Sequence, residues 1–321
     1  MAYTDSQIMM TLAALAYAPA KDIWSHLLPT TNPSNATEGD WALVWGPAVT
    51  PRDAGNLMFV TYNKSTNQYA IAVRGTYPYF GLPLLVDLYE DLDVSHPRPW
   101  QYPAVPGALV AAGTIDGLND IVAFTSDGVA FRTFVESQIA PSGADVFVTG
   151  HSLGGALTTV LAPWLVHQLS QSGAKNAVMP YTYAAPTAGN ATFASFYTGL
   201  FKISYRYYNA IDIVPKAWAD LPGIKSLYSS PGPDCPWELK GTIDLVSDWL
   251  KVAKVSYSQP NEAGERLPGM PSSTSDFFHE ALDQHDHNYY LKLLGAPTVP
   301  ITAPGASQLK KKHSLGSWGQ V

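Results

Sequence analysis

Short runs of apolar and β-branched residues along the chain predict the strands of a sheet. Five such runs are Leu57–Tyr62, Tyr69–Arg74, Asp145–Thr149, Pro180–Tyr183 and Ser204–Tyr208. Two longer stretches between them, Leu109–Ser137 and Leu153–Leu169, have a helical pattern. Strands and helices in alternation predict a mostly parallel sheet covered by helices. Pro163 lies inside the second stretch and is expected to kink that helix or mark its weakest turn.

Two segments interrupt this alternation. Trp24–Asp53 is rich in Pro, Asn and Thr, which predicts a long loop or a small excursion of the chain. Ala219–Ser275 carries many Pro, Gly and Ser residues around a helical stretch at Ile243–Val252, and we interpret it as an insertion outside the sheet. We therefore expect a single α/β domain over residues 1–300, with that insertion, and a poorly ordered C-terminal tail over residues 301–321.

Composition excludes several classes of protein. Of the 321 residues, 46% are hydrophobic and 14% are charged, which predicts a large core and excludes a disordered chain. The formal net charge is -7, and Lys310–Lys312 is the one cluster of basic residues, so nucleic acid is not expected as a partner. The single cysteine, Cys235, can form neither an intrachain disulfide nor a thiolate metal cage.

The N-terminal segment is open to two interpretations. Met9–Ala18 is apolar and ends in Ala-Tyr-Ala at residues 16–18, which resembles a signal-peptidase site. However, the residues before this run contain no Lys or Arg and include Asp5, so an amphipathic first helix capped by Thr4 or Asp5 is favoured. No apolar run has the length of a transmembrane helix, and the sequence favours no particular compartment.

The candidate nucleophile lies between a predicted strand and a predicted helix. There Gly150-His-Ser-Leu-Gly154 forms the pattern G-x-S-x-G in its required strand–turn–helix context. The turn is strained and crowded, so small residues are needed on both sides of Ser152, and the following helix directs its positive end at the site. A chance glycine-rich turn is the alternative, which the flanking elements disfavour. His151 is adjacent to the serine and is interpreted as a packed supporting side chain.

With this motif in place, the chain resembles the class 3 lipases, the fungal-lipase-like branch of the α/β-hydrolases. The matching blocks are the G-x-S-x-G segment, Ile71–Thr76 as the oxyanion strand, Tyr181–Phe193 as the next strand and loop, Tyr208–Pro215 as the acid segment and His287–Tyr290 as the histidine segment. The resemblance implies the α/β-hydrolase fold and ester hydrolysis. The chain departs from the family at Thr187, where Arg is usual, at residues 111–113, which lack the usual His and Phe, and in the long run between Asp212 and His287. These departures bear on substrate preference.

A serine hydroxyl needs a base beside it. Chain order in this fold is Ser, acid, His, and His313 lies in the predicted tail, which leaves His279, His285 and His287 as candidates. The H-x-x-Y pattern of the resembling family selects His287, with Tyr290, while His285 remains the alternative. The same H-D-H run is compatible with a solvated turn or, together with Asp283, with a metal site. Alternating ligands this close rarely complete a metal site, so no metal is expected.

The acid and the oxyanion donors complete the predicted machinery. Asp212 follows a strand, where a carboxylate faces the crevice of an α/β sheet, and the match to the acid segment favours it over a turn or N-cap role. Asp220 is the alternative acid. The backbone N–H groups of Leu153, directly after the serine, and of Thr76, at the end of its strand, are predicted to hold the oxyanion.

An apolar segment follows the predicted oxyanion strand. Tyr77–Tyr89 carries one formal charge, Asp87, and its prolines and glycine argue against an ordinary strand. In the resembling family a mobile lid that shields an acyl groove lies here, and a fixed apolar wall is the alternative. The candidate residues for the lid or acyl groove are Tyr77, Tyr79, Phe80, Leu82, Leu84 and Leu85.

The prediction from sequence is a carboxylic ester hydrolase, in particular a triacylglycerol lipase. It is expected to act through a Ser-His-Asp triad and an acyl-enzyme on ester lipids at a lipid–water interface, with no cofactor. The alternatives are another esterase with the same triad, either a phospholipase or an aryl or feruloyl esterase, and a catalytically silent binding protein with this fold.

Overall fold

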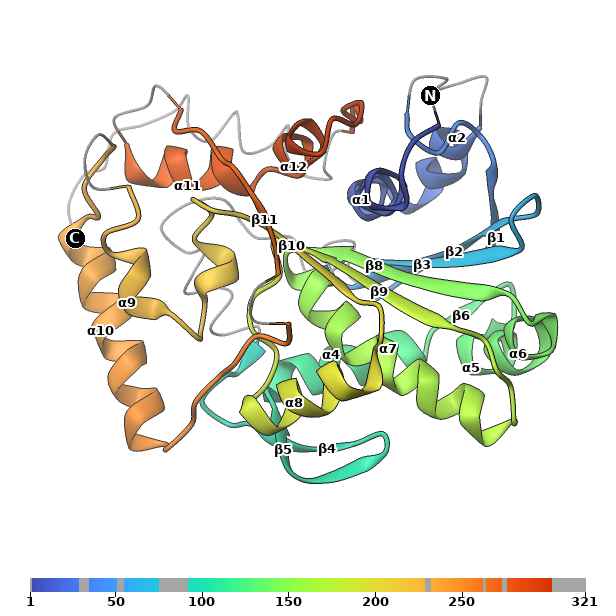
Figure 1. The fold of residues 1–321 in the computed structure, drawn as a ribbon, viewed down its shortest axis with the longest axis horizontal. Helices are drawn as coiled ribbons and strands as arrows, with labels where there is room; N and C mark the ends of the chain where they lie inside the picture. The colour runs from blue at the N-terminus through green and yellow to red at the C-terminus, as the bar shows by residue number, and fades with distance from the viewer. Residues whose placement is uncertain are drawn as a thin grey trace.

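The computed structural model describes residues 2–28, 35–50, 55–74, 92–228, 232–261, 264–272 and 276–301. Within these residues the chain builds a seven-stranded sheet of order β1-β2-β3-β8-β9-β10-β11 (Figure 1). Its strands are β1 (Trp41–Val49), β2 (Leu57–Asn63), β3 (Gln68–Arg74), β8 (Asp145–His151), β9 (Val178–Tyr183), β10 (Tyr205–Asn209) and β11 (Glu265–Leu267). Pairing is antiparallel from β1 to β3 and parallel from β3 to β11. The predicted mostly parallel sheet covered by helices is therefore confirmed.

Helices cover both faces of this sheet (Figure 1). One face carries α1, α2 and α12, and the opposite face carries α4, α5, α7 and α8, whereas α9, α10 and α11 gather beyond β10 and β11. Their bounds are α1 (Asp5–Leu15), α2 (Ile23–Leu27), α4 (Ala112–Val122), α5 (Phe131–Phe134), α6 (Ala140–Ser142), α7 (Leu153–Gln171), α8 (Ala191–Leu200), α9 (Leu221–Ile224), α10 (Trp237–Val252), α11 (Phe277–His285) and α12 (His287–Leu293). Short 3-10 turns lie at Ala20–Asp22 and Val214–Lys216.

Alternate residues of the strands supply the two cores of the sheet. In β2, Met58 packs into the core beneath α4 and α7, and Phe59 packs into the core beneath α1. In β8, Val146 and Val148 belong to the first core and Phe147 to the second. This period of two explains why these strands have continuous apolar sequences, since both faces are buried.

The five predicted strands are present as β2, β3, β8, β9 and β10. The helix predicted over Leu153–Leu169 is also confirmed, because α7 covers it and continues through Pro163. The helical stretch predicted at Ile243–Val252 is the C-terminal part of α10. The extent of the domain over residues 1–300 stays a prediction, and residues 302–321 of the tail lie outside the described part of the chain.

The interpretation of Leu109–Ser137 as a stretch that holds one long helix is wrong. Leu109 ends strand β5 (Ala104–Val110), which pairs with β4 (Arg98–Gln101), and α4 ends at Val122. A hairpin of β6 (Thr125–Ser126) and β7 (Val129–Ala130) follows, and then α5 runs into a π-helical turn at Val135–Ile139. Asp127 and Gly128 have φ of 48° and 79°, so this Asp-Gly pair forms a hairpin turn that a helix cannot continue through.

The long loop predicted over Trp24–Asp53 is also wrong, because its second half contains the nine-residue strand β1. The register with β2 shifts between Leu43 and Trp45 and again between Trp45 and Ala48, which breaks the alternation expected of a strand. Pro47 is tolerated because β1 lies at the edge of the sheet.

The interpretation of residues 219–275 as lying outside the sheet needs a correction. Within this segment β11 pairs in parallel with β10, from Tyr207↔Glu265 to Asn209↔Leu267. A three-residue strand is too short to show a period of two, which explains why the sequence pattern missed it.

The first helix is capped as predicted but is not amphipathic. Thr4 accepts from the Gln7 N–H, and the Gln7 side chain accepts from the Thr4 N–H, so the two form a capping box. All residues from Met9 to Leu15 are buried, because this part of α1 contacts the sheet on one side and α12 on another. The apolar sequence that resembles a signal peptide therefore has a structural role here.

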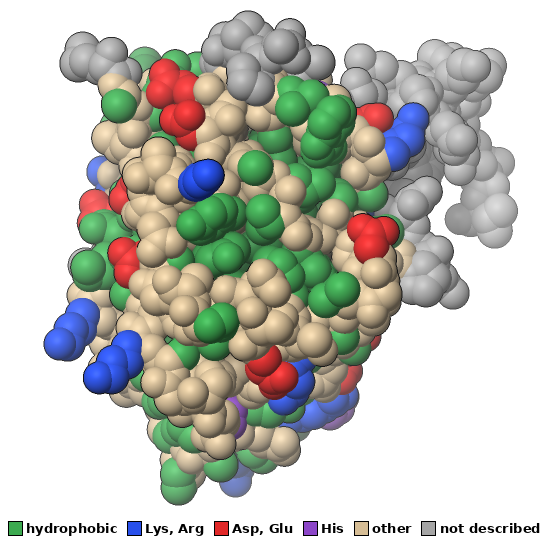
Figure 2. Space-filling model, turned by 90° about the vertical axis from the view of Figure 1, so that its right-hand side faces the viewer, with side chains coloured by type: hydrophobic (Ala, Val, Ile, Leu, Met, Phe, Trp, Pro, Cys, Tyr) green, Lys and Arg blue, Asp and Glu red, His purple; other side chains and the backbone are tan. Residues whose placement is uncertain are grey.

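On the face shown in Figure 2, acidic and basic side chains are interspersed with hydrophobic ones. Among the described residues, no helix combines the length and the apolar character needed to cross a membrane.

Candidate active site

Ser152 occupies a strained turn between β8 and α7. Its backbone has φ 58° and ψ -128°, a region that a side chain disfavours at a cost of about 1–3 kcal/mol. The Ser152 N–H donates to the Tyr183 carbonyl at 2.9 Å, and the Ser152 carbonyl accepts from the Gly155 N–H at 2.8 Å. These bonds hold the serine at the end of the strand, as its motif predicts.

The two motif glycines are required by close contacts. A Cβ at Gly150 would collide with the Gly154 carbonyl, and a Cβ at Gly154 would collide with the Val73 carbonyl of β3. A Cβ at Gly155 would come 2.7 Å from the Ala185 Cβ. The spacing of G-x-S-x-G therefore reflects how closely α7 approaches the sheet.

The structure places His285, not His287, beside the serine. His285 Nε2 lies 2.7 Å from Ser152 Oγ, and its Nδ1 lies 2.8 Å from Asp212 Oδ2. The His285 side chain is 7% exposed and that of Asp212 is fully buried. The prediction that His287 occupies the position of the base is therefore wrong, and the alternative that the sequence left open is the one that the geometry supports.

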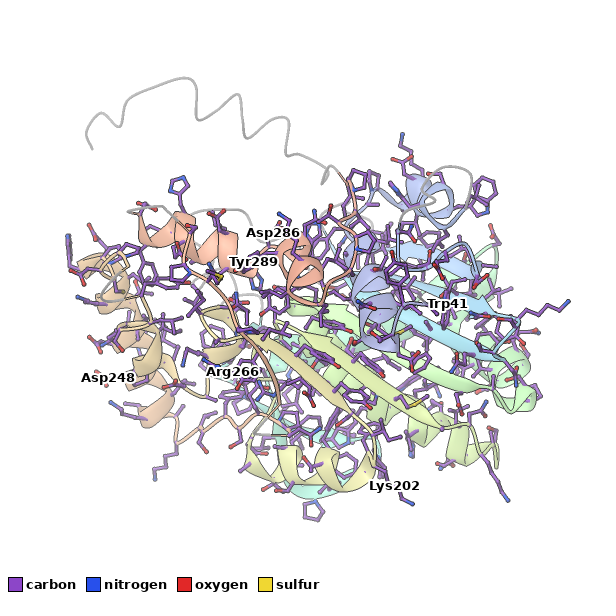
Figure 3. The ribbon with its side chains drawn as sticks, turned by 45° about the horizontal axis from the view of Figure 1, so that its top comes forward. Trp41, Lys202, Asp248, Arg266, Asp286 and Tyr289 are labelled. Atoms are coloured by element: carbon purple, nitrogen blue, oxygen red, sulfur yellow. The ribbon has the colours of Figure 1, made fainter. Side chains whose placement is uncertain are left out.

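A corner between two helices separates the histidines. His285 ends α11, His287 begins α12, and Asp286 between them has an extended backbone (φ -62°, ψ 131°). The Asp286 carboxylate accepts from the N–H groups of Asn288 and Tyr289 and so caps α12 (Figure 3). Because the chain turns at this cap, the two imidazoles point to different neighbours. An Asp N-cap within the H-D-H run was the sequence signal for such a corner.

Tyr290, which the H-x-x-Y pattern singled out with His287, contacts the acid instead. Its hydroxyl donates to Asp212 Oδ2 at 2.8 Å and accepts from the Asn209 N–H at 2.9 Å. Burial and then the charge of Asp212 raise the pKa of Tyr290 well above its usual range, which keeps the phenol neutral and able to donate. Sequence reasoning missed this role for the tyrosine.

Asp212 is held where the sequence predicts the acid. It follows β10, is 1% exposed, and its Oδ1 accepts from the Val214 N–H at 2.9 Å. The alternative acid, Asp220, caps α9 by accepting from the Gly223 N–H at 3.1 Å and pairs with Lys216 at 2.8 Å. The Asp220 side chain is 52% exposed. Its contacts account for an aspartate at this position without a role beside the serine.

The metal interpretation of the H-D-H run finds no support in the geometry. Both ring nitrogens of His285 are hydrogen-bonded, to Asp212 and to Ser152, so neither is available as a ligand. His279 Nδ1 pairs with Asp276 at 2.9 Å on the surface. In the part of the chain that the structure describes, no three His, Cys, Asp or Glu side chains gather as metal ligands would.

One of the two predicted oxyanion donors lies within the described residues. Leu153 is the first residue of α7, so its N–H has no acceptor within the helix and lies at the positive end of the helix dipole. The predicted partner donor Thr76 and the whole segment Tyr77–Tyr89 lie outside the described residues. Their roles stay predictions.

Two more histidines pack behind the triad. His151 is 3% exposed, and burial, followed by the nearby His285 and His287, holds its pKa well below its usual value. Burial also lowers the pKa of His287, against the opposing charge of Asp286. The imidazole of His151 is thus buried in its neutral form, as its interpretation as a packed side chain implies.

This burial predicts a stability that falls in mild acid. The unfolded chain binds a proton at His151 near pH 6.5, but the folded chain does so only at a lower pH, so stability is present above the unfolded pKa and falls as pH drops. Below about pH 6.5 the free energy of unfolding should decrease by up to about 1.4 kcal/mol per pH unit for this histidine. Urea unfolding between about pH 7 and pH 5 measures it. A His151→Asn variant should show a shallower dependence, and equal slopes would contradict the assignment.

The chain is similar in sequence to known lipases. The model of the class 3 lipase family matches residues 71–221. Lipase ZK262.3 of Caenorhabditis elegans is 31% identical over 139 residues, which are 43% of this chain and 30% of that protein. Secreted mono- and diacylglycerol lipase 1 of Fusarium solani is 38% identical over 140 residues, which are 44% of this chain and 37% of that protein. The chain thus spans about a third of the length of these curated relatives.

The structural likeness extends further along the chain. The crystal structure of M37 lipase superposes on 97% of this chain and 99% of its own, with a TM-score of 0.84 and 27% sequence identity. The predicted α/β-hydrolase fold and the predicted resemblance to class 3 lipases are therefore confirmed.

Proposed function

We propose, from the match of the class 3 lipase family model to residues 71–221, that this chain hydrolyses carboxylic esters. The observation that carries the proposal is the continuous path of hydrogen bonds Asp212–His285–Ser152, with distances of 2.8 and 2.7 Å. This is the arrangement in which a neutral imidazole removes the serine proton while a buried carboxylate orients it.

In the proposed reaction, Ser152 Oγ attacks the ester carbonyl as His285 Nε2 takes its proton. Asp212 holds the proton on Nδ1 and stabilises the imidazolium that forms. The N–H of Leu153, together with the predicted N–H of Thr76, stabilises the tetrahedral oxyanion. His285 then protonates the departing alcohol, and a water deprotonated by His285 releases the acid from the acyl-enzyme.

The substrate we propose is an acylglycerol-type ester, which makes the protein a triacylglycerol lipase. Leu153, directly after the serine, belongs to a buried apolar cluster that includes Ile213, Val214 and Trp218, and this apolar character beside the serine supports a substrate with a hydrocarbon chain. The Fusarium solani relative carries mono- and diacylglycerol lipase in its name. The apolar composition of Tyr77–Tyr89 agrees with this substrate class.

The experiment compares hydrolysis of a short-chain triglyceride, a long-chain triglyceride, phosphatidylcholine and an aryl ester, with Ser152→Ala protein as the blank. Turnover of the long triglyceride above the phospholipid and the aryl ester supports the proposal. Turnover confined to soluble short esters or to the aryl ester would identify the protein as an esterase instead of a lipase. A preference for phosphatidylcholine would identify it as a phospholipase. A protein that hydrolyses none of the four overturns the proposed function.

We further propose that Tyr77–Tyr89 governs access to the serine as a lid or groove wall. Exposed apolar side chains cost about 25 cal/mol per Å², a cost that a lipid surface removes, so an open state would gain population on aggregated substrate. Replacing Leu84 and Leu85 by Ser is expected to lower activity on long-chain emulsions more than on soluble short esters. An equal fall on both substrates would identify the segment as a fixed wall.

A further inference from the structure

The side chain of Tyr17 lies behind the candidate active site, two residues beyond the end of α1. It is 8% exposed and contacts both the turn that carries Ser152 and the segment that carries His285. These two segments are 133 residues apart in the chain, and the geometry of the triad depends on how they are held together.

The first contact holds the turn of the nucleophile. The Tyr17 hydroxyl lies 3.0 Å from His151 Nδ1 and donates to the His151 carbonyl at 3.3 Å. That carbonyl and the Ser152 N–H are the two polar groups of one peptide, and the N–H donates to Tyr183 O at 2.9 Å. Hydrogen bonds therefore hold both polar groups of the peptide that precedes the strained Ser152, and Tyr17 donates one of these bonds.

The second contact reaches the segment of the base. The Tyr17 ring stacks on His287, with ring centroids 5.2 Å apart and an interplanar angle of 15°. His287 is two residues after His285 and begins α12. The ring of His151 lies 4.8 Å from that of His285 and 5.4 Å from that of Tyr290, which holds Asp212. Tyr17, His151 and His287 thus form a cluster, here named the N-terminal clamp, that packs against His285 and against Tyr290, the residue that donates to Asp212.

The hydroxyl matters to this clamp because His151 is buried. A neutral His151 with its proton on Nδ1 lets the one hydroxyl accept from the ring and donate to the carbonyl. The contact with Tyr17 holds the Nδ1 side of the His151 imidazole, whose ring packs against that of His285. Removal of the hydroxyl would leave a buried ring donor unsatisfied and would free the ring that packs against His285.

We propose that Tyr17 is a positioning residue for catalysis: through His151 and His287 it sets the distance and angle between Ser152 Oγ and His285 Nε2. The inference rests on the proposed function. We assign it a role in alignment, because Tyr17 contacts His151 and His287, which are neighbours in sequence of the reacting residues. Catalytic groups must be held to within about 0.5 Å, and a displacement of 1 Å costs about 10²-fold in rate, so a small loss of alignment is measurable.

The test is the Tyr17→Phe variant, which removes the hydroxyl and keeps the ring. We expect kcat to fall by about tenfold with KM unchanged, because alignment acts on the chemical step and not on substrate binding. The rate constant for labelling of Ser152 by a small fluorophosphonate should fall by a similar factor, and active-site titration should count as many sites as in the parent. Tyr17→Leu, which also removes the stacking on His287, should lower kcat further.

Thr149→Val is the matched control, because the Thr149 hydroxyl donates to the Met9 carbonyl at 3.0 Å and so also joins α1 to β8. It should leave kcat per titrated site unchanged. Equal kcat per site in Tyr17→Phe and the parent, or an equal fall in Tyr17→Phe and Thr149→Val, overturns the proposal. If Tyr17→Leu does not fold, the comparison of Tyr17→Phe with Thr149→Val still tests the proposal. A parent protein that neither hydrolyses esters nor reacts with the fluorophosphonate refutes the proposed function instead.

Discussion

Ser152→Ala is expected to leave a folded protein whose ester turnover is lower by at least about 10³-fold. The serine supplies the one nucleophile that His285 can deprotonate, since its Oγ is 2.7 Å from His285 Nε2 at the end of β8. Alanine keeps the backbone bonds to Tyr183 and Gly155, so the turn should persist without its hydroxyl. Initial rates on a short-chain ester, together with circular dichroism and the melting temperature, measure the two parts of this prediction.

The control for this substitution is Ser170→Ala on the same helix. The Ser170 hydroxyl bonds to the His167 carbonyl at 2.7 Å near the exposed end of α7, and its loss should leave turnover unchanged. Labelling by a fluorophosphonate should disappear in Ser152→Ala and persist in Ser170→Ala. A folded Ser152→Ala protein that retains most of its activity would refute the nucleophile and, with it, the proposed mechanism.

His285→Ala is expected to lose as much activity as Ser152→Ala, about 10³-fold or more, whereas His287→Ala should lose less than about tenfold. The difference follows from what each ring touches. His285 joins Asp212 to Ser152, so its removal leaves the serine without a base. His287 stacks on Tyr17 and lies 3.8 Å from Asp286, so its removal affects alignment alone.

The ranking of these two variants decides between the two histidines of the H-D-H run. The substitutions are identical and two residues apart, so each serves as the control for the other. Both should retain the fold, because His285 and His287 lie at the ends of their helices. A more severe loss in His287→Ala would return the role of base to His287 and would mean that the corner at Asp286 rearranges during catalysis.

The features that the sequence determined by itself are those fixed by residues close together in the chain. The apolar runs from β2 to β10 are strands because residues on both of their faces are buried. Ser152 was predictable because close packing of α7 on the sheet excludes side chains at Gly150 and Gly154, and this leaves a local signature. Asp212 was predictable because it follows a strand end, where parallel sheets expose their catalytic groups.

Tertiary structure decided which histidine meets the serine and what holds it. His285 and His287 are two residues apart in a similar polar context, and their directions differ because Asp286 caps α12 and turns the chain there. The strand β11 forms because its three residues pair with β10, and three residues are too few to show the alternating pattern of a strand in the sequence. Tyr17 reads in sequence as part of an apolar N-terminal run, and it reaches His151 because α1 packs against β8. In each case the deciding contact joins residues that are distant in the chain, so a local sequence pattern cannot predict it.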